Sequence, residues 1–195
     1  MREETVDGQS RLMSSNPDRR GYIALRNGRY SMRNGCYLLT TVTADREPWF
    51  ADEHAARAVA SLHAGQELFA DAELLAWVLM PDHWHGLLRL GESLGLPELM
   101  NRFKTRSAIA ANAVLRRRGR LWFAGYHDRA VRNEAHLNAA ASYVLQNPVK
   151  AGLSELPTDY PWLEGSLIDV GPRGPPTEIT SALLSVGGPP GPTRP

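Results

Sequence analysis

The stretch AELLAWVLMPDHWHGLLRL, residues 72–90, constrains the fold of this chain more than any other segment. Its two apolar parts, residues 73–80 and 83–90, each have the length of one strand, and Pro81 and Asp82 between them are a turn signal. The first part is apolar on both faces, which is typical of a strand in the centre of a sheet. The stretch therefore predicts a β-hairpin in the middle of a β-sheet.

Elements of alternating type surround this hairpin. Residues 35–44 are rich in β-branched and aromatic side chains and predict a strand, and residues 121–132 can contain a shorter one. The patterns of residues 51–65, 95–119 and 133–146 predict helices. The resulting order β-α-β-β-α-β-α predicts an α/β (α+β) chain with a ferredoxin-like split βαβ layout, an antiparallel sheet and helices mainly on one face.

The two ends of the chain differ in composition from its middle. Residues 1–20 are polar and without periodicity, so we expect a flexible N-terminal arm. Residues 171–195 contain five Gly and seven Pro and predict a disordered tail. Residues 21–170 are then expected to form one domain, which is long enough to bury a sizeable core.

Cysteine content and hydropathy indicate the compartment. The chain carries one cysteine, Cys36, so no disulfide can form within it, and this favours a reducing cytosol. No apolar run approaches the ~18 charge-free residues of a membrane helix, and the polar N-terminus does not have the pattern of a signal peptide. We therefore expect a cytoplasmic protein that does not enter a membrane.

The net charge of +1 indicates no partner, but the basic residues are clustered. Residues 102–132 contain nine Lys or Arg side chains and a single acid, Asp128. Such a block suggests a polyanionic partner, although a solvated helix face is the more frequent reason for one. The hydrophobic share of 43% and the charged share of 22% are ordinary for a soluble globular protein.

His83 and His85 lie inside the apolar hairpin. Because alternate residues of a strand point to the same face, the two rings should project side by side, with Trp84 on the opposite face. They are candidates for binding one ion, since imidazole is the commonest metal ligand. Without a cysteine cluster, Mg²⁺ or Mn²⁺ with phosphate oxygens is favoured over a structural zinc site. The alternative is two partly buried rings that are hydrogen-bonded to neighbours.

The helix predicted over residues 133–146 carries a second candidate group. Tyr143 and Asn147 are four residues apart and stand on one face beside its apolar stripe, and His136 lies near the same edge. A tyrosine hydroxyl can act as a covalent nucleophile when a metal ion activates the phosphate it attacks, and Asn147 could give that ion an oxygen ligand. The alternatives are a packing role for Tyr143 and a helix C-cap role for Asn147.

Several motifs taken together resemble the REP-associated tyrosine transposases, relatives of the single-tyrosine transposases of small bacterial insertion sequences. MPDHWHGLL resembles their histidine–hydrophobic–histidine (HUH) motif, and YVLQNPVKAGL, residues 143–153, resembles their tyrosine signature. LMNRFKTR, LWFAGYHDRAVRNEAHL and DYPWLEGS resemble the segments between and after these motifs. The resemblance extends over residues 20–166, which is most of the chain.

This resemblance implies a ferredoxin-like domain in which His83, His85 and Asn147 bind a divalent cation, Mg²⁺ or Mn²⁺, and Tyr143 is the nucleophile. In such enzymes the tyrosine attacks a phosphodiester of single-stranded DNA, which leaves a 5′-phosphotyrosine and a 3′-OH that can later rejoin strands. We therefore expect a metal-dependent tyrosine transposase that acts on single-stranded or hairpin DNA at palindromic repeats. It is expected to be associated with the nucleoid, as a monomer or a homodimer.

Two residues depart from the family pattern. Asp82 stands where many members have Asn and would add negative charge near the metal, and Phe123 stands where many have Gln. Under the same resemblance, the basic block would contact DNA phosphates and make binding salt-dependent. The residues expected to do so are Arg102, Lys104, Arg106, Arg116, Arg117 and Arg118.

Two other functions stay open at this point. One is a catalytically silent relative that only binds hairpin DNA or RNA, because ferredoxin-like sheets also serve as RNA-binding surfaces. The other is a metal-dependent hydrolase that acts through water, with Tyr143 only structural. A covalent adduct between DNA and Tyr143 would distinguish the transposase from both.

Overall fold

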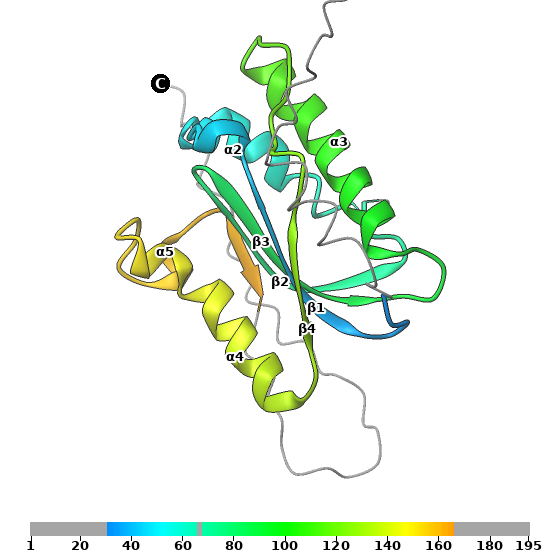
Figure 1. Ribbon diagram of the computed structural model, residues 1–195. Coiled ribbons are helices and arrows are strands. Elements are labelled where there is room, and N and C mark those ends of the chain that lie inside the picture. Colours follow the sequence, from blue (N-terminus) through cyan, green and yellow to red (C-terminus); the bar gives the residue numbers. More distant parts are fainter. Residues whose placement is uncertain (1–30, 66–67, 166–195) are drawn as a thin grey trace, which may run out of the picture. The chain divides into compact units, whose positions relative to one another are not determined.

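The computed structural model of the protein describes residues 31–65 and 68–165 (Figure 1). Within them the strands form one sheet in the order β4-β1-β3-β2-β5, and every neighbouring pair is antiparallel. The strands are β1 (Cys36–Val42), β2 (Ala72–Met80), β3 (His83–Leu90), β4 (His127–Val131) and β5 (Leu163–Gly165). The antiparallel α+β fold predicted from the sequence is therefore confirmed.

The predicted hairpin is formed by β2 and β3, at the centre of the sheet. Met80 pairs with His83 across the turn, and His83 also pairs with Val42 of β1 on its other side. Two backbone amides from outside the hairpin fasten the turn, since Phe50 donates to the carbonyl of Pro81 and Thr43 donates to that of Asp82. The turn that precedes the histidine pair is thus held on both sides.

Two helices cover one face of the sheet, α2 (Glu53–Ala60) and α3 (Leu96–Val114) (Figure 1). Asp52 begins α2 by accepting a hydrogen bond from the backbone amide of Ala55, a typical N-cap contact. The larger core lies between these helices and the sheet, where Trp84 of β3 packs against Phe103 of α3 with ring centroids 4.4 Å apart.

The opposite face is covered by α4 (Glu134–Leu145), which the short helix α5 (Asn147–Lys150) follows. Asn133 caps α4 by accepting from the amide of His136, as its sequence position predicts. Here Val144 packs against Val78 and Leu87 of the hairpin. The expectation of helices mainly on one face holds for α2 and α3 but not for α4. The reason is that β2 is apolar on both faces, with Ala76, Val78 and Met80 on the side of α4, and bare apolar surface is unfavourable in water.

The structure leaves part of the predicted domain organisation outside its described residues. The predicted arm, residues 1–20, and the predicted tail, residues 171–195, both lie there, as do both ends of the predicted domain, residues 21–170. Across residues 31–65 and 68–165, none of the helices combines the length and apolarity that crossing a membrane requires.

Candidate functional site

The histidine pair occupies the start of β3, next to the hairpin turn. The rings of His83 and His85 lie with their centroids 4.8 Å apart and nearly perpendicular, at 79°. Trp84 between them points to the other face, where it is fully buried in the larger core. The alternation expected from the sequence thus places both imidazoles on the face that α4 covers.

His85 is the buried member of the pair, with 4% of its surface exposed. Its Nδ1 atom lies 2.7 Å from the hydroxyl of Thr40 on β1, and its Nε2 atom lies 3.4 Å from the hydroxyl of Tyr143 on α4. Burial, with the charges of His83 and Arg46 adding to it, lowers the pKa of His85 to about 3. The ring is therefore neutral near pH 7, which is the protonation state of a metal ligand.

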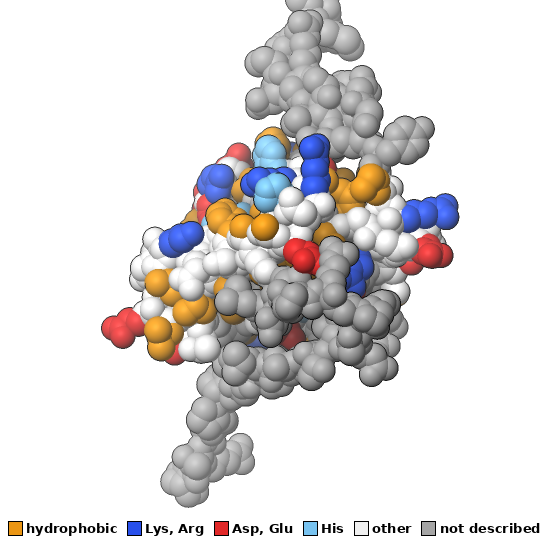
Figure 2. Space-filling model, turned by 90° about the horizontal axis from the view of Figure 1, so that it is seen from below, with side chains coloured by type: hydrophobic (Ala, Val, Ile, Leu, Met, Phe, Trp, Pro, Cys, Tyr) orange, Lys and Arg blue, Asp and Glu red, His pale blue; other side chains and the backbone are white. Residues whose placement is uncertain are grey.

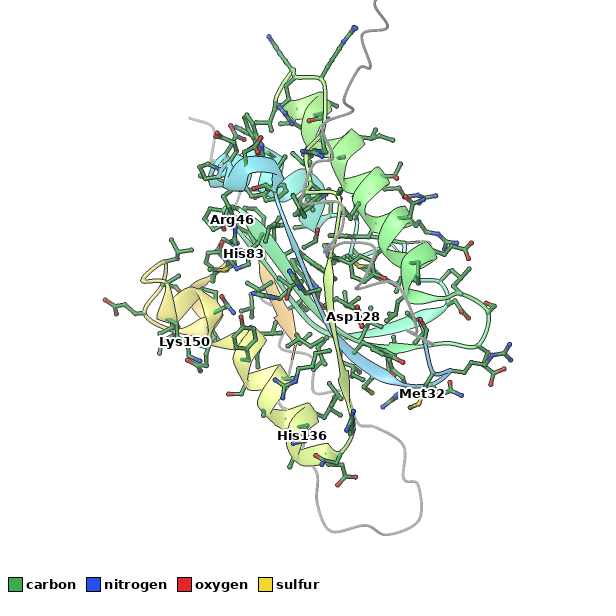
Figure 3. All side chains as sticks on the ribbon, in the orientation of Figure 1. Met32, Arg46, His83, Asp128, His136 and Lys150 are labelled. Carbon is green, nitrogen blue, oxygen red and sulfur yellow. The ribbon has the colours of Figure 1, made fainter. Side chains whose placement is uncertain are left out.

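His83 is less buried and is held by a charged network. Its Nδ1 atom lies 2.5 Å from a carboxylate oxygen of Asp82, and Arg46 donates to the other oxygen at 3.1 Å. Figure 3 shows Arg46 and His83 close together at one end of the hairpin. Burial alone would raise the pKa of Asp82, but the hydrogen bonds from His83 and Arg46 outweigh it and leave that pKa below its usual value. An ionised Asp82 keeps the ring proton on Nδ1 and leaves Nε2 as a ligand atom.

Tyr143 stands on α4 beside the histidines, as its helix position predicts. Its side chain is 41% exposed, and its ring meets the ring of His85 edge-on with centroids 5.1 Å apart. The ammonium of Lys150 on α5 lies 5.8 Å from the centroid of the same tyrosine ring. The phenol is thus reachable from solvent while touching a buried imidazole and facing a positive charge.

Asn147 is the first residue of α5, and its Nδ2 donates to the backbone carbonyl of Tyr143 at 3.4 Å. This contact leaves the amide oxygen available, although Asn147 makes no hydrogen bond to either histidine in the described part of the chain. No cluster of three His, Cys, Asp or Glu side chains suited to a metal lies within that part either. The donor set that fits a divalent ion there is two imidazole nitrogens and one amide oxygen.

His63, just after α2, was not recognised from the sequence. Its ring stacks on Trp77 at 3.9 Å, and its Nε2 accepts a hydrogen bond of 3.1 Å from the indole of Trp84. Because an indole N–H only donates, the proton of His63 must sit on Nδ1, which lies 3.2 Å from the carbonyls of Val59 and Ala60. Burial lowers the pKa of His63 to about 4 and keeps it neutral. His63 thereby anchors the residue between the two candidate ligands.

The predicted DNA-contacting residues do not gather around Tyr143. They belong to α3 and the loop after it, and α3 packs on the face that buries Trp84, opposite the histidine pair. Lys104 is engaged within the fold, since its ammonium donates to the carbonyls of Phe123 and Gly125 at 2.5 and 2.9 Å. Arg117 donates to Asn112 and lies 4.1 Å from the ring centroid of Trp49.

The remaining members of this basic set are placed differently. Arg106, Arg116 and Arg118 are exposed, and Arg102 is partly buried. The exposure of Arg106, Arg116 and Arg118 fits a polyanion-binding surface.

Comparisons with known proteins address the family and the fold. A family model described as "Transposase IS200 like" matches residues 31–147. Among solved structures, a REP-associated tyrosine transposase bound to a REP hairpin is similar, with a TM-score of 0.57, 21% identity, and coverage of 69% of this chain and 79% of that one. A candidate transposase from Deinococcus radiodurans R1 is also similar, with a TM-score of 0.44, 24% identity and coverage of 63% and 96%. No curated protein matches.

The region that the family model matches contains the candidate nucleophile and the three candidate ligands, while Lys150 lies beyond it. It begins just before β1 and includes both histidines and Tyr143, and it ends at Asn147. The first of the two solved structures agrees with the sheet and helices described above. The resemblance noted in the sequence is thus confirmed at the level of family and fold, and the chain belongs to the IS200-like transposases.

Proposed function

We propose that this transposase cleaves and rejoins single-stranded DNA at hairpin-forming repeats, using a divalent metal and a covalent link to Tyr143. The observation that carries the proposal is the contact between Tyr143 and His85, whose hydroxyl oxygen and Nε2 atom lie 3.4 Å apart. This contact joins a solvent-accessible phenol to the imidazole pair, which is the arrangement that phosphoryl transfer to a tyrosine needs.

His83, His85 and Asn147 are the residues proposed to hold the ion, Mg²⁺ or Mn²⁺. The hydrogen-bonding partners of the two rings support this, since Asp82 and Thr40 engage the Nδ1 atoms, and the Nε2 atom of His85 is turned toward the hydroxyl of Tyr143. A bound divalent ion supplies positive charge to the oxygens of the phosphate and makes its phosphorus a better electrophile.

In the proposed step the hydroxyl oxygen of Tyr143 forms a bond to the phosphorus of a DNA phosphodiester. The bond from phosphorus to the 3′ oxygen breaks, the phenol proton is lost to solvent, and the leaving oxygen takes up a proton to become a 3′-OH. The 5′-phosphotyrosine keeps the energy of a phosphodiester, so a 3′-OH can reverse the reaction and join strands. The ammonium of Lys150, 5.8 Å from the centroid of the Tyr143 ring, adds a positive charge beside the nucleophile.

The proposed partner is DNA with a hairpin and an unpaired flank. A similar solved structure is bound to a REP hairpin, and this chain has exposed basic residues after α3 that suit a phosphate backbone. Its affinity for DNA should therefore fall steeply as the salt concentration rises.

The test is covalent capture of DNA. The full chain is incubated with Mg²⁺ or Mn²⁺ and single-stranded fragments of its own genome, denatured and allowed to fold into hairpins, and adducts are isolated under denaturing conditions. Wild type should retain DNA linked to Tyr143, identified by mass spectrometry of the peptide, and Tyr143→Phe should retain none.

Other outcomes would overturn the proposal. An adduct that persists in Tyr143→Phe would place the nucleophile elsewhere, and cleavage without any adduct would indicate hydrolysis by water. Hairpin binding without cleavage in either metal would indicate a catalytically silent DNA-binding protein.

A further inference from the structure

A cleft of about 500 Å³ lies beside Tyr143, between α4 and the strands β1 and β4. In its floor Thr40 is paired with His127 and Leu38 with Arg129, so these side chains point to the face that α4 covers. Its wall is one stripe of α4 with helical spacing, made of His136, Ala139, Ala140 and Tyr143. The cleft is thus formed by regular elements rather than by a loop.

The packing of α4 explains why this space is open. The buried residues of the helix pack toward β2 and β3, where Ala141 and Val144 meet Val78 and Leu87. On the side toward β4 the helix presents Ala139 and Ala140, whose methyl groups are too small to fill the gap. The same helix therefore closes one side of its sheet face and leaves the other side accessible.

The cleft ends at the candidate site. Two of its lining residues, Thr40 and Tyr143, contact opposite nitrogens of the His85 ring. A DNA strand whose phosphate lies at the hydroxyl of Tyr143 must continue past this ring in both directions. The cleft is the cavity that adjoins Tyr143 on the side of β4.

The chemistry of the lining suits a nucleotide. Leu38, Ala139 and Ala140 provide an apolar surface, and the imidazoles of His127 and His136 provide planes on which a base can stack. Arg129 adds a cation. Its acidic neighbour Asp128 also belongs to the lining, although strand alternation directs the Asp128 side chain to the other face of the sheet. Figure 3 shows His136 on α4, and Figure 2 shows histidines beside Lys or Arg side chains on the face seen from below.

We propose that this cleft binds one unpaired nucleotide of the DNA strand, the one adjoining the phosphate that Tyr143 attacks. The base lies against Ala139 between the two imidazoles, and Arg129 faces the next phosphate along the strand. This inference rests on the proposed function, because Tyr143 places the scissile phosphate. The volume of about 500 Å³ is in the range of pockets that hold small ligands and admits a single base with its sugar.

The test compares cleft variants with matched controls. Ala139→Trp fills the cleft, whereas Ala135→Trp adds the same bulk to an exposed position of α4 that does not line it. Arg129→Gln removes the cation, and Arg132→Gln removes an exposed arginine just outside. Circular dichroism and thermal melting check that each variant is folded, and the rate of adduct formation is measured at subsaturating DNA. We expect losses of about tenfold or more in kcat/KM for the cleft variants, the effect of one stacked base, and near-wild-type values for the controls.

A second substrate distinguishes a nucleotide pocket from an indirect effect on Tyr143. Covalent capture first locates the cleaved phosphate, and substrates are then made with an abasic site at each adjoining position. With the abasic site in the proposed position, wild type should become as slow as Ala139→Trp, and the variant should lose nothing further. The proposal would be overturned if Ala139→Trp were slower than wild type by the same factor on abasic DNA as on intact DNA. It would also be overturned if Ala139→Trp reacted at the same rate as Ala135→Trp.

Failure of this inference differs from failure of the proposed function. If wild type forms adducts that no cleft variant affects, the function stands and the cleft proposal is wrong. If no adduct forms at all, fluorescence anisotropy with a labelled (dT)₁₀ oligonucleotide still tests the cleft. Binding that is weakened by Ala139→Trp and Arg129→Gln but not by their controls would support it, and equal binding by all four would overturn it.

Discussion

The hydroxyl of Thr40 and the phenol of Tyr143 contact opposite nitrogens of one imidazole, that of His85, at 2.7 and 3.4 Å. Thr40 belongs to β1 and Tyr143 to α4, so His85 links the sheet to the helix that carries the candidate nucleophile. We assign the ring proton to Nδ1, where it donates to Thr40, because the phenol can donate to Nε2. The orientation of the ring is thus set before any metal or DNA binds.

Thr40→Val should therefore weaken metal binding while leaving the fold intact. The variant removes the acceptor for Nδ1–H, and loss of such a partner typically costs about 10- to 100-fold in metal affinity. Isothermal titration with Mn²⁺ measures the effect. Thr41→Val is the matched control, because the Thr41 hydroxyl is buried without a hydrogen-bond partner among residues 31–65 and 68–165. Its removal should leave metal binding unchanged and raise stability by about 1 kcal/mol. Equal Mn²⁺ affinity in both variants would contradict the assigned role of Thr40.

Asp82→Asn is expected to keep the position of His83 but to lower the affinity of the site for divalent metal. The amide oxygen can still accept from Nδ1–H, yet the negative charge that makes the ring a stronger ligand is lost, and we expect about a tenfold weaker Mn²⁺ affinity. Arg46→Gln removes the cation that partly neutralises Asp82 and should shift the affinity in the opposite direction. If both variants changed the Mn²⁺ affinity in the same direction, the contacts of Asp82 with His83 and Arg46 would act through packing and not through charge.

Acidification should destabilise the protein through His63. Its pKa is about 4 in the folded state and near 6.5 in the unfolded state, so the unfolded state binds more protons between these values. Stability is then fully present above pH 6.5 and falls by roughly 3 kcal/mol as the pH drops to 4. The buried His85 adds a loss of the same sign. Urea unfolding of the metal-free protein at several pH values checks this.

The matched variant for this prediction is His63→Gln. Its side-chain oxygen can accept from the Trp84 indole but does not titrate, so the loss of stability between pH 6.5 and 4 should be smaller than in wild type. An unchanged pH dependence would mean that His63 does not contribute to it.

Within the basic segment, we expect Lys104 to contribute to the stability of the fold and Arg118 to contribute to DNA binding. Lys104→Met removes the donor to the carbonyls of Phe123 and Gly125 and should cost about 1–3 kcal/mol of unfolding free energy. Burial, with Arg120 adding to it, lowers the pKa of Lys104 to about 8, so this lysine loses its proton more readily in the folded state than in the unfolded chain. Arg118→Met, at an exposed position, should leave stability unchanged and reduce the slope of hairpin affinity against salt. Denaturant unfolding and anisotropy titrations at several salt concentrations measure both.

Much of the fold followed from local pattern in the sequence. The hairpin around Pro81, the cap at Asn133 and the order of strands and helices are all encoded by neighbouring residues. Two features were not. The strand β5 has only three residues and carries no periodicity to detect. The apolar stripe of α4 tells which side of the helix is buried, but not which face of the sheet it meets.

In the candidate site, too, the sequence predicts some features and not others. The spacing of His83 and His85 along a strand and of Tyr143 and Asn147 along a helix is sufficient to place each pair on one face. The residues that orient them come from distant segments, since Thr40, Arg46 and His63 lie 45, 36 and 21 residues from the groups they contact. Such contacts depend on strand register and on the path of loops, which a pattern of residue types does not determine.

The indole of Trp84 lies directly over Gly86, where a Cβ atom would be 2.0 Å from the nearest carbon of the ring. The short motif His-Trp-His is therefore in physical terms a motif of four residues that includes the glycine. A large side chain in the middle position requires a hydrogen atom two residues later, and a smaller one would release that requirement. Positions 84 and 86 should accordingly change together among related chains, with tryptophan accompanied by glycine and bulkier residues at 86 appearing only where the ring at 84 is gone.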